Sequence, residues 1–247
     1  MGLKIIGVDC ATDPKKTGLA LGAIDGNKTV ISEVTTGGTE NPADIIHEWI
    51  RNHRQVLLAL DAPLGWPADL GSTLTVHRAG DGMGTDANDL FRRETDRFVT
   101  QTLGKRPLDV GADRIARTAH SALTLLDELR DLTGSQIPLA WSPKLSEKVE
   151  AIEVYSAGTL TALGLPSSGY KKPCDKKTRV RILEGIKELL DMSVTAEDAL
   201  AGNADLLDAV ICVLAGRDFL DWKVLPPGSL DLARQEGWIW VRPRDGF

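Results

Sequence analysis

Cysteine, aromatic residues and long apolar runs are all scarce in this chain of 247 residues. Its three cysteines, Cys10, Cys174 and Cys212, lie far apart and form no CxxC pair, so neither a disulfide framework nor a zinc site is expected. No apolar run approaches the about 18 residues that a membrane helix needs, and the N-terminal stretch lacks the layout of a signal peptide. We therefore expect a cytoplasmic protein with no membrane contact.

Histidine motifs and an excess of positive charge are also missing. The four histidines are scattered and form no metal-ligand pattern, and 29 Lys and Arg face 35 Asp and Glu, for a net charge of −6. Proteins that coat nucleic acid without selection need many phosphate contacts, and this charge argues against that class. An enzyme with a local basic groove is not excluded.

The bulk composition is that of an ordinary globular protein, with 42% hydrophobic and 26% charged residues. A chain of this length can bury a large core, and it has no internal repeat and no low-complexity tract. No stretch reads as a domain boundary. We therefore expect one domain that covers residues 1–247.

The first quarter of the chain predicts the order β-β-β-α-β. An Asp25-Gly26-Asn27 turn signal indicates that the second and third strands form a hairpin, and Asn41-Pro42 is typical of a helix start. A parallel strand that follows a crossover helix belongs to a mixed α/β sheet flanked by helices. The four predicted strands cover residues 3–9, 18–24, 28–34 and 56–60.

The rest of the chain predicts a long insertion, followed by helices and one further strand. Residues 62–110 are rich in Gly, Pro, Asp and Thr, with one or two helical turns expected within 86–100. Alternation predicts a strand at 148–155, and the tail at 238–241 is a candidate edge strand. Apolar periodicity predicts helices at 111–132, 177–191 and 203–221.

Five acidic residues follow or interrupt these elements in a pattern that suggests a shared site. Asp9 and Asp61 come directly after apolar strands, and ligands of α/β sheets bind outside the carboxyl ends of strands. Glu153 lies in the later strand, while Asp205 and Asp208 are spaced i, i+3 on one face of an apolar helix. Each acid alone could equally be structural: a turn or cap residue, or, for Glu153, an ion-pair partner.

Carboxylates from several elements are the ligands that Mg²⁺ and Mn²⁺ prefer. Two such ions, about 4 Å apart, can hold the attacking water and the leaving oxygen of a phosphodiester. We expect a metal site made of Asp9, Asp61, Asp205 and Asp208, and a catalytic set that adds Glu153 to these four.

The order of these elements and the positions of the acids resemble the ribonuclease H-like superfamily. In that superfamily a meander is followed by a helix and a fourth strand, and the first and fourth strands carry acids. The D-L-L-D-A-V segment at 205–210 is similar to a helix of the crossover-junction resolvase branch. More closely, the chain resembles the family of domain of unknown function 429, a predicted ribonuclease H-like nuclease. The matching segments are G-V-D at 7–9, L-D-A-P-L-G-W-P at 60–67, R-E-T-D at 93–96, E-V-Y at 153–155, Y-K at 170–171 and D-L-L-D-A at 205–209.

Two features depart from the pattern of that family. The loop C-A-T-D-P-K-K after the first strand replaces a more Gly-rich loop, which leaves substrate handling open. Ser156 stands where the family usually has Pro, a change that we expect to affect only the local backbone.

Candidate substrate contacts lie in the insertion and in a basic segment. Residues 170–181 hold six Lys or Arg and one Asp, so they could contact phosphates or simply form a solvated basic surface. For Arg93 and Asp96 in the insertion, local salt bridges are the alternative to substrate contact. Trp66, also in the insertion, could stack a base. The predicted substrate-binding residues are Trp66, Arg93, Asp96, Tyr170, Lys171 and Arg179.

The sequence thus predicts a metal-dependent nuclease that hydrolyses phosphodiester bonds of DNA or RNA, with Mg²⁺ or Mn²⁺ as cofactor. Two other interpretations remain open. One is a ribonuclease H-like scaffold that binds a partner without catalysis. The other is an actin-like nucleotide-binding phosphotransferase, which a single copy of the fold makes less favoured.

Overall fold

Six strands form one mixed sheet in the computed structural model, which describes residues 2–111 and 113–244. The strand order is β5-β4-β1-β2-β3-β6, with β1 parallel to β4 and antiparallel to β2. This confirms an α/β fold with a mixed sheet flanked by helices. The strands are β1 (Lys4–Asp9), β2 (Gly18–Asp25), β3 (Lys28–Thr36), β4 (Val56–Asp61), β5 (Val149–Glu153) and β6 (Leu190–Asp191).

The N-terminal strands form the predicted meander. Strands β2 and β3 are antiparallel and joined by a two-residue turn, in which Gly26 takes a left-handed φ of 56°. The crossover helix α1 (Pro42–Arg51) begins as predicted, because the Asn41 side chain accepts a hydrogen bond from the Ala43 backbone N–H. Strand β4 then pairs in parallel with β1 and brings its carboxyl end to the same edge of the sheet.

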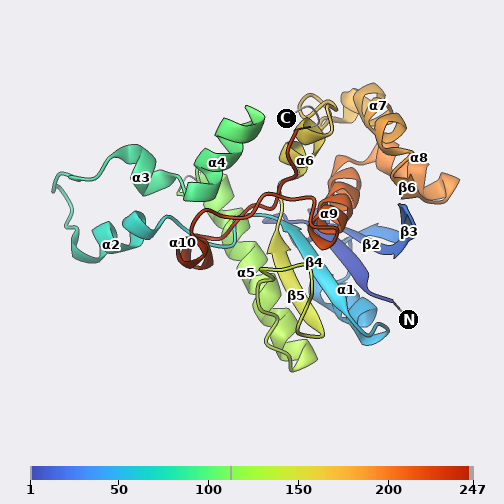
Figure 1. The fold of residues 1–247 in the computed structure, drawn as a ribbon, viewed down its shortest axis with the longest axis horizontal. Helices are drawn as coiled ribbons and strands as arrows, with labels where there is room; N and C mark the ends of the chain where they lie inside the picture. The colour runs from blue at the N-terminus through green and yellow to red at the C-terminus, as the bar shows by residue number, and fades with distance from the viewer. Residues whose placement is uncertain (1, 112, 245–247) are drawn as a thin grey trace.

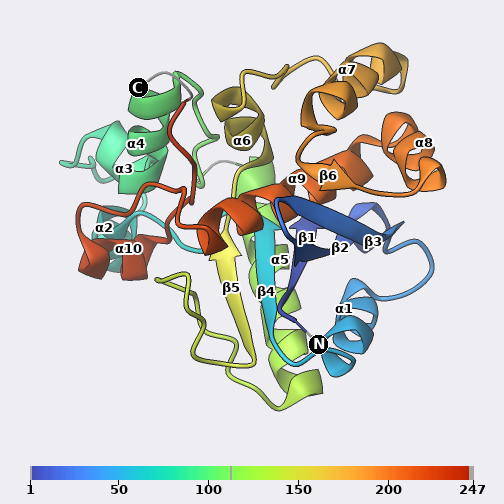
Figure 2. The same ribbon diagram turned by 45° about the vertical axis from the view of Figure 1, so that its right-hand side comes forward.

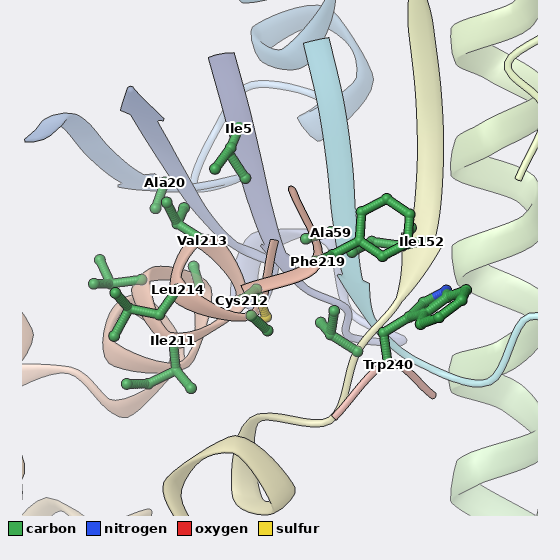
Figure 3. Close-up of a cluster of buried hydrophobic side chains, with 14 of the residues drawn as sticks. Ile5, Ala20, Ala59, Ile152, Ile211, Cys212, Val213, Leu214, Phe219 and Trp240 are labelled. Atoms are coloured by element: carbon green, nitrogen blue, oxygen red, sulfur yellow. The ribbon is translucent and has the colours of Figure 1, made fainter. Parts of the chain in front are cut away.

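Helices cover both faces of the sheet (Figures 1 and 2). Helix α9 (Ala204–Leu220) packs across β1, β2 and β4 on one face, whereas α1 and α5 (Asp113–Thr133) cover the other. Figure 3 shows Ile5, Ala20 and Ala59 of the strands facing Cys212 and Val213 of α9. Strand side chains alternate between the two apolar layers, which is the period-2 pattern of a sheet buried on both sides.

Helix α9 is largely buried against the sheet, with 13 of its 17 residues buried. No single helix among residues 2–111 and 113–244 is long and apolar enough to cross a membrane. The pair of α8 (Val194–Gly202) and α9 reaches the required length and composition only together, across a bend of 118°.

The insertion after β4 contains more helix than the sequence predicted. It forms α2 (Ala68–Val76), α3 (Ala87–Phe91) and α4 (Glu94–Leu103), of which the first two form an arm that projects from the body (Figure 1). Helix α2 escaped prediction because none of its residues is buried, so it has no apolar stripe. Helix α4 buries Val99 and Leu103 against the body.

The C-terminal half corrects two predicted boundaries. The helix predicted at 177–191 is α7 (Lys176–Ile186), and the chain then joins the sheet edge as β6 because the Thr29 backbone N–H donates to Leu189 O. The tail at 238–241 forms an isolated parallel bridge between Ile239 and Glu153 rather than a full strand. Besides α2, two 3₁₀ turns and three helices were not predicted: η1 (Pro14–Lys16), η2 (Pro173–Asp175), α6 (Ser156–Ala162), α8 (Val194–Gly202) and α10 (Leu230–Glu236).

Candidate functional site

Asp9 and Asp61 end neighbouring parallel strands and are direct partners in the register of β1 and β4. Neighbouring strands lie about 4.8 Å apart, so the two side chains start from adjacent points of the sheet. Gly7 and Ala59, two positions earlier in each strand, face α9. Since side chains alternate along a strand, Asp9 and Asp61 extend from that same face. The sequence prediction that these two acids meet at one edge is confirmed.

Two glycines allow α9 to approach this edge of the sheet. A Cβ atom on Gly7 would lie 2.0 Å from the Ala209 carbonyl oxygen, and one on Gly18 would lie 2.1 Å from the Asp205 carbonyl oxygen. Gly18 is the antiparallel partner of Asp9. The first turn of α9 is therefore seated beside the end of β1, which brings Asp205 next to Asp9.

Asp208 lies one turn further along α9 and is completely buried. Its Oδ1 accepts a hydrogen bond of 2.8 Å from the Tyr170 hydroxyl, and its Oδ2 contacts the Lys171 ammonium. A buried carboxylate is tolerated when its oxygens are paired in this way. Both oxygens of Asp208 thus have partners from the chain itself, whereas no hydrogen bond to the Asp205 carboxylate is found among the described residues.

Ser156 connects the end of β5 with Asp61. Its backbone N–H donates to Asp61 Oδ2 over 3.3 Å, and its hydroxyl donates to the Asp208 carbonyl oxygen over 3.4 Å. The expectation that Ser156 affects only the local backbone is therefore wrong. A proline has neither an N–H nor a hydroxyl and could make neither contact.

Burial shifts Asp9 and Asp61 toward the protonated form, and like charge adds to the shift of Asp9. Burial is the largest cause and raises the pKa of Asp9 to about 8, with Asp61 and Asp205 adding to the shift and the Lys171 ammonium opposing it. The pKa of Asp61 is also raised by burial, against Lys171 and the hydrogen bond from Ser156. Within the described residues, Lys171 is the cation that acts on both acids.

The side chains fit a hard cation by chemistry, although they are not gathered into a finished ligand set. Within residues 2–111 and 113–244, no three Cys, His, Asp or Glu side chains are placed to hold one metal ion as they stand. Burial raises the pKa of the Cys10 and Cys212 thiols well above the ordinary value, so thiolate ligands are disfavoured. Asp9 and Asp61, both half-buried, offer the carboxylate oxygens that Mg²⁺ and Mn²⁺ prefer.

Tyr170 and Lys171 contact Asp208, whereas the hydrogen bonds of the Arg179 guanidinium among the described residues all go to backbone carbonyl oxygens. Arg179 is 2% exposed, and its Nη1 donates to the carbonyl oxygens of Tyr170 at 2.6 Å and Lys172 at 2.8 Å. Its remaining nitrogens donate to carbonyl oxygens at the ends of η2 and α8. The prediction that Arg179 binds substrate is contradicted, because its N–H groups are committed to the backbone.

Arg93, Asp96 and Glu153 form a buried ion-pair network that holds the insertion against β5. Arg93 Nη2 lies 2.9 Å from Asp96 Oδ1 and 2.7 Å from Glu153 Oε1. Arg93 Nε donates to Asp96 and its Nη1 to Glu153 and the Glu236 carbonyl oxygen, so all five N–H donors are used.

This network contradicts the prediction that Arg93 and Asp96 bind substrate, since neither has a free polar group to offer. For Glu153 the structure supports the ion-pair interpretation over the catalytic one. Its Oε2 accepts from both Arg93 and the Leu64 backbone N–H. The i, i+3 pair of Arg93 and Asp96 was visible in the sequence, but the link to Glu153 was not, because the two lie 60 residues apart.

Trp66 is half-buried in the segment between β4 and α2, and no contact of its ring with the acids is found among the described residues. Its role in base stacking stays a prediction.

A cavity of about 140 Å³ lies beside Asp61, with Tyr155 and Leu108 in its wall. Tyr155 was not predicted as a site residue, although it follows Glu153 in the E-V-Y segment.

A second cavity, of about 220 Å³, lies on the other face of the sheet, where the loop after β1 meets α1 and α5. Cys10 lies in its wall because it points away from Asp9, its neighbour in the chain. The loop that follows β1 is thus the rim of this cavity.

Comparison with known proteins identifies the family of the chain. A search of curated proteins found no match to the chain. One family profile matches residues 7–227, a span that includes β1, β4 and α9 and hence Asp9, Asp61, Asp205 and Asp208. The chain belongs to the family described as protein of unknown function DUF429.

Proposed function

We propose that this protein is a metal-dependent nuclease that hydrolyses phosphodiester bonds. The observation that carries the proposal is the register pairing of Asp9 with Asp61, beside which Gly18 allows Asp205 to be seated. Three carboxylates from three elements thus approach one edge of the sheet. This arrangement is what a ribonuclease H-like topology would require, and that finer classification of the fold is part of the proposal.

In this proposal Asp9 and Asp61 would hold a Mg²⁺ or Mn²⁺ ion, with Asp205 as a further oxygen ligand. The ion would lower the pKa of an attacking water and would offset the negative charge on the phosphate. Ser156 orients Asp61 through its backbone N–H. A fixed donor of this kind limits the reorientation of the carboxylate during reaction.

The surface beside the site supports a polyanionic substrate. Lys172, Lys176, Lys177 and Arg181 are all exposed, and they follow Lys171 along η2 and α7. Exposed basic side chains of this kind contact phosphates and position a nucleic-acid strand without reading its sequence. The cavity beside Asp61 provides room for a group next to the scissile bond.

The test is cleavage of a panel of single-stranded, duplex and branched DNA and RNA with Mn²⁺. Wild type is expected to cleave at least one substrate, and Asp9→Asn is expected to lower the rate by at least about 100-fold, because one ligand of the ion loses its charge. Asp131→Asn is the matched control, since Asp131 is exposed on α5. Equal inactivity of wild type and Asp9→Asn would refute the nuclease and favour a binding scaffold.

A further inference from the structure

We infer that the Lys171 ammonium supplies the second positive charge of this carboxylate site, so that the site takes one divalent ion and not two. The inference rests on the proposed metal-dependent function and specifies how that site is built. It assigns Asp208 to Lys171 rather than to the metal, and it makes Tyr170 and Arg179 positioning residues.

The contact between Lys171 and Asp208 is the first observation. Asp208 has no exposed surface, and its two oxygens are taken by the Tyr170 hydroxyl and the Lys171 ammonium. Removing one partner from a buried charge pair leaves the other charge without compensation, which is strongly unfavourable. An ion that recruited Asp208 would have to displace Lys171 first.

The backbone around Lys171 is the second observation. The carbonyl groups on either side of Lys171, those of Tyr170 and Lys172, accept hydrogen bonds from the same nitrogen, Nη1 of buried Arg179. Arg179 Nε also donates to Ala201 O over 2.8 Å, which fastens this loop to the end of α8. Surface lysines usually lack such restraint and gain little from an ion pair. Here the backbone of Lys171 is fixed while its side chain, 55% exposed, reaches Asp208 from the solvent side.

The reach of the Lys171 charge is the third observation. Among the charged groups that act on Asp9 and Asp61, Lys171 has the largest influence, and it favours the ionised form of both. The ammonium thus lies within electrostatic range of the two acids that we propose as ligands as well as in contact with Asp208. A second divalent ion in this space would meet like charge.

The ligand count leads to the same conclusion. Two ions held about 4 Å apart need several carboxylates, at least one of them shared between both ions. With Asp208 paired, the site has Asp9, Asp61 and Asp205 to offer, and no cluster of three ligands is finished among the described residues. This set suits one hexacoordinate ion that keeps several waters, as Mg²⁺ usually does.

The experiment measures Mn²⁺ binding without substrate, by calorimetry and by electron paramagnetic resonance. Wild type is expected to bind one Mn²⁺ per chain with the spectrum of an isolated ion. Lys171→Met keeps the apolar stem but removes the charge, which frees Asp208, so it is expected to bind two Mn²⁺ with spin coupling between them. Lys171→Arg keeps the charge and is expected to bind one.

Two further variants make the result specific to Lys171. Lys187→Met removes an exposed charge at the end of α7 and is expected to leave the stoichiometry at one. The double variant Lys171→Met with Asp208→Asn lacks both partners and is expected to return to one ion. A thermal melt of each variant checks that it is folded.

The outcomes separate this inference from the proposed function. Two coupled Mn²⁺ ions in wild type would overturn the inference and leave a metal-dependent nuclease standing. One ion in both wild type and Lys171→Met would also overturn it, because the ammonium would then exclude nothing. No Mn²⁺ binding by folded wild type at millimolar metal would overturn the proposed function and this inference together.

Discussion

Asp9 and Asp61 are register partners on two parallel strands, and Lys171 is the cation that acts on both. Two carboxylates at adjacent points of a sheet repel each other when ionised, and burial strengthens the repulsion. The two carboxylates lie at one edge of the sheet, and both α9 and the segment that carries Lys171 approach that edge. Three predictions concern the geometry around this pair, and a fourth concerns the ion-pair network of Arg93.

The first prediction concerns pH and stability without metal. The native pKa of Asp9 is raised to about 8, whereas that of the unfolded chain stays near 3.8, so the native state binds more protons between these values. The stability that this proton confers is complete below about pH 4 and is lost as pH rises toward 8. Each pKa unit corresponds to about 1.4 kcal/mol, and we expect a loss of about 1–3 kcal/mol after discounting for solvent contact and coupling.

The measurement is the melting temperature in chelator from pH 5 to pH 9 for wild type, Asp9→Asn and the control Asp131→Asn. Asp9→Asn is expected to gain stability relative to wild type as pH rises, while Asp131→Asn follows wild type. Parallel profiles for all three proteins would show that the Asp9 carboxyl is not held protonated in the native state.

The second prediction isolates the hydrogen bond from Ser156 to Asp61. Ser156 is the first residue of α6, a position where proline is tolerated, and Tyr155 before it has an extended backbone that suits a following proline. Ser156→Pro therefore removes the N–H with little strain and is expected to destabilise the protein by about 1.5–3 kcal/mol, as for a lost bond to a charged group. The effect should grow as pH rises, because the Asp61 carboxyl becomes more ionised.

Ser156→Ala is the matched variant, because it keeps the N–H and loses only the hydroxyl. Urea denaturation of the two variants at pH 6 and pH 8.5 compares their free energies of unfolding. If Ser156→Ala is as destabilised as Ser156→Pro at both pH values, the backbone bond to Asp61 contributes nothing measurable.

The third prediction concerns the approach of α9 to the sheet. A methyl group at Gly18 would lie 2.1 Å from the Asp205 carbonyl oxygen, a backbone atom that can move only with its helix. Gly18→Ala is expected to cost about 1–3 kcal/mol, the usual range for overpacking, and to weaken Mn²⁺ binding because Asp205 is pushed from Asp9.

Gly71→Ala is the control, since nothing lies within 4 Å of its Cβ position in α2. Alanine is the better helix former, so this variant is expected to be neutral or slightly more stable than wild type. Chemical denaturation gives the free energies and calorimetry the Mn²⁺ affinity. An unchanged affinity in a destabilised Gly18→Ala would mean that Asp205 does not contact the ion.

The fourth prediction assigns Arg93 to stability rather than to substrate. Arg93→Met leaves Glu153 and Asp96 buried without their partner, and such losses cost about 3–5 kcal/mol. Arg97→Met removes an exposed pair with Asp89 and is expected to cost less than about 1 kcal/mol. Urea denaturation measures both. A normally stable Arg93→Met with reduced nucleic-acid affinity would instead restore the substrate role.

Much of the fold could be predicted because its elements carry local signals. The meander, α1, β4, α5 and α9 follow from apolar period and from turn and cap residues such as Asn41. Helix α2 could not be predicted, because it buries no residue, and the end of α7 could not, because sheet pairing with β3 overrides helical spacing there. Tertiary pairing decides such segments.

For the candidate site, the sequence by itself determined which acids stand at strand ends and on one helix face. It could not separate Asp208 from Asp205, or Glu153 from Asp61, since a carboxylate looks the same in a sequence whether it faces a cation or a cleft. Only the tertiary structure places Lys171 on Asp208 and Arg93 on Glu153. The physical reason is that pairing of buried charges depends on contacts between distant segments, and local patterns carry no record of those contacts.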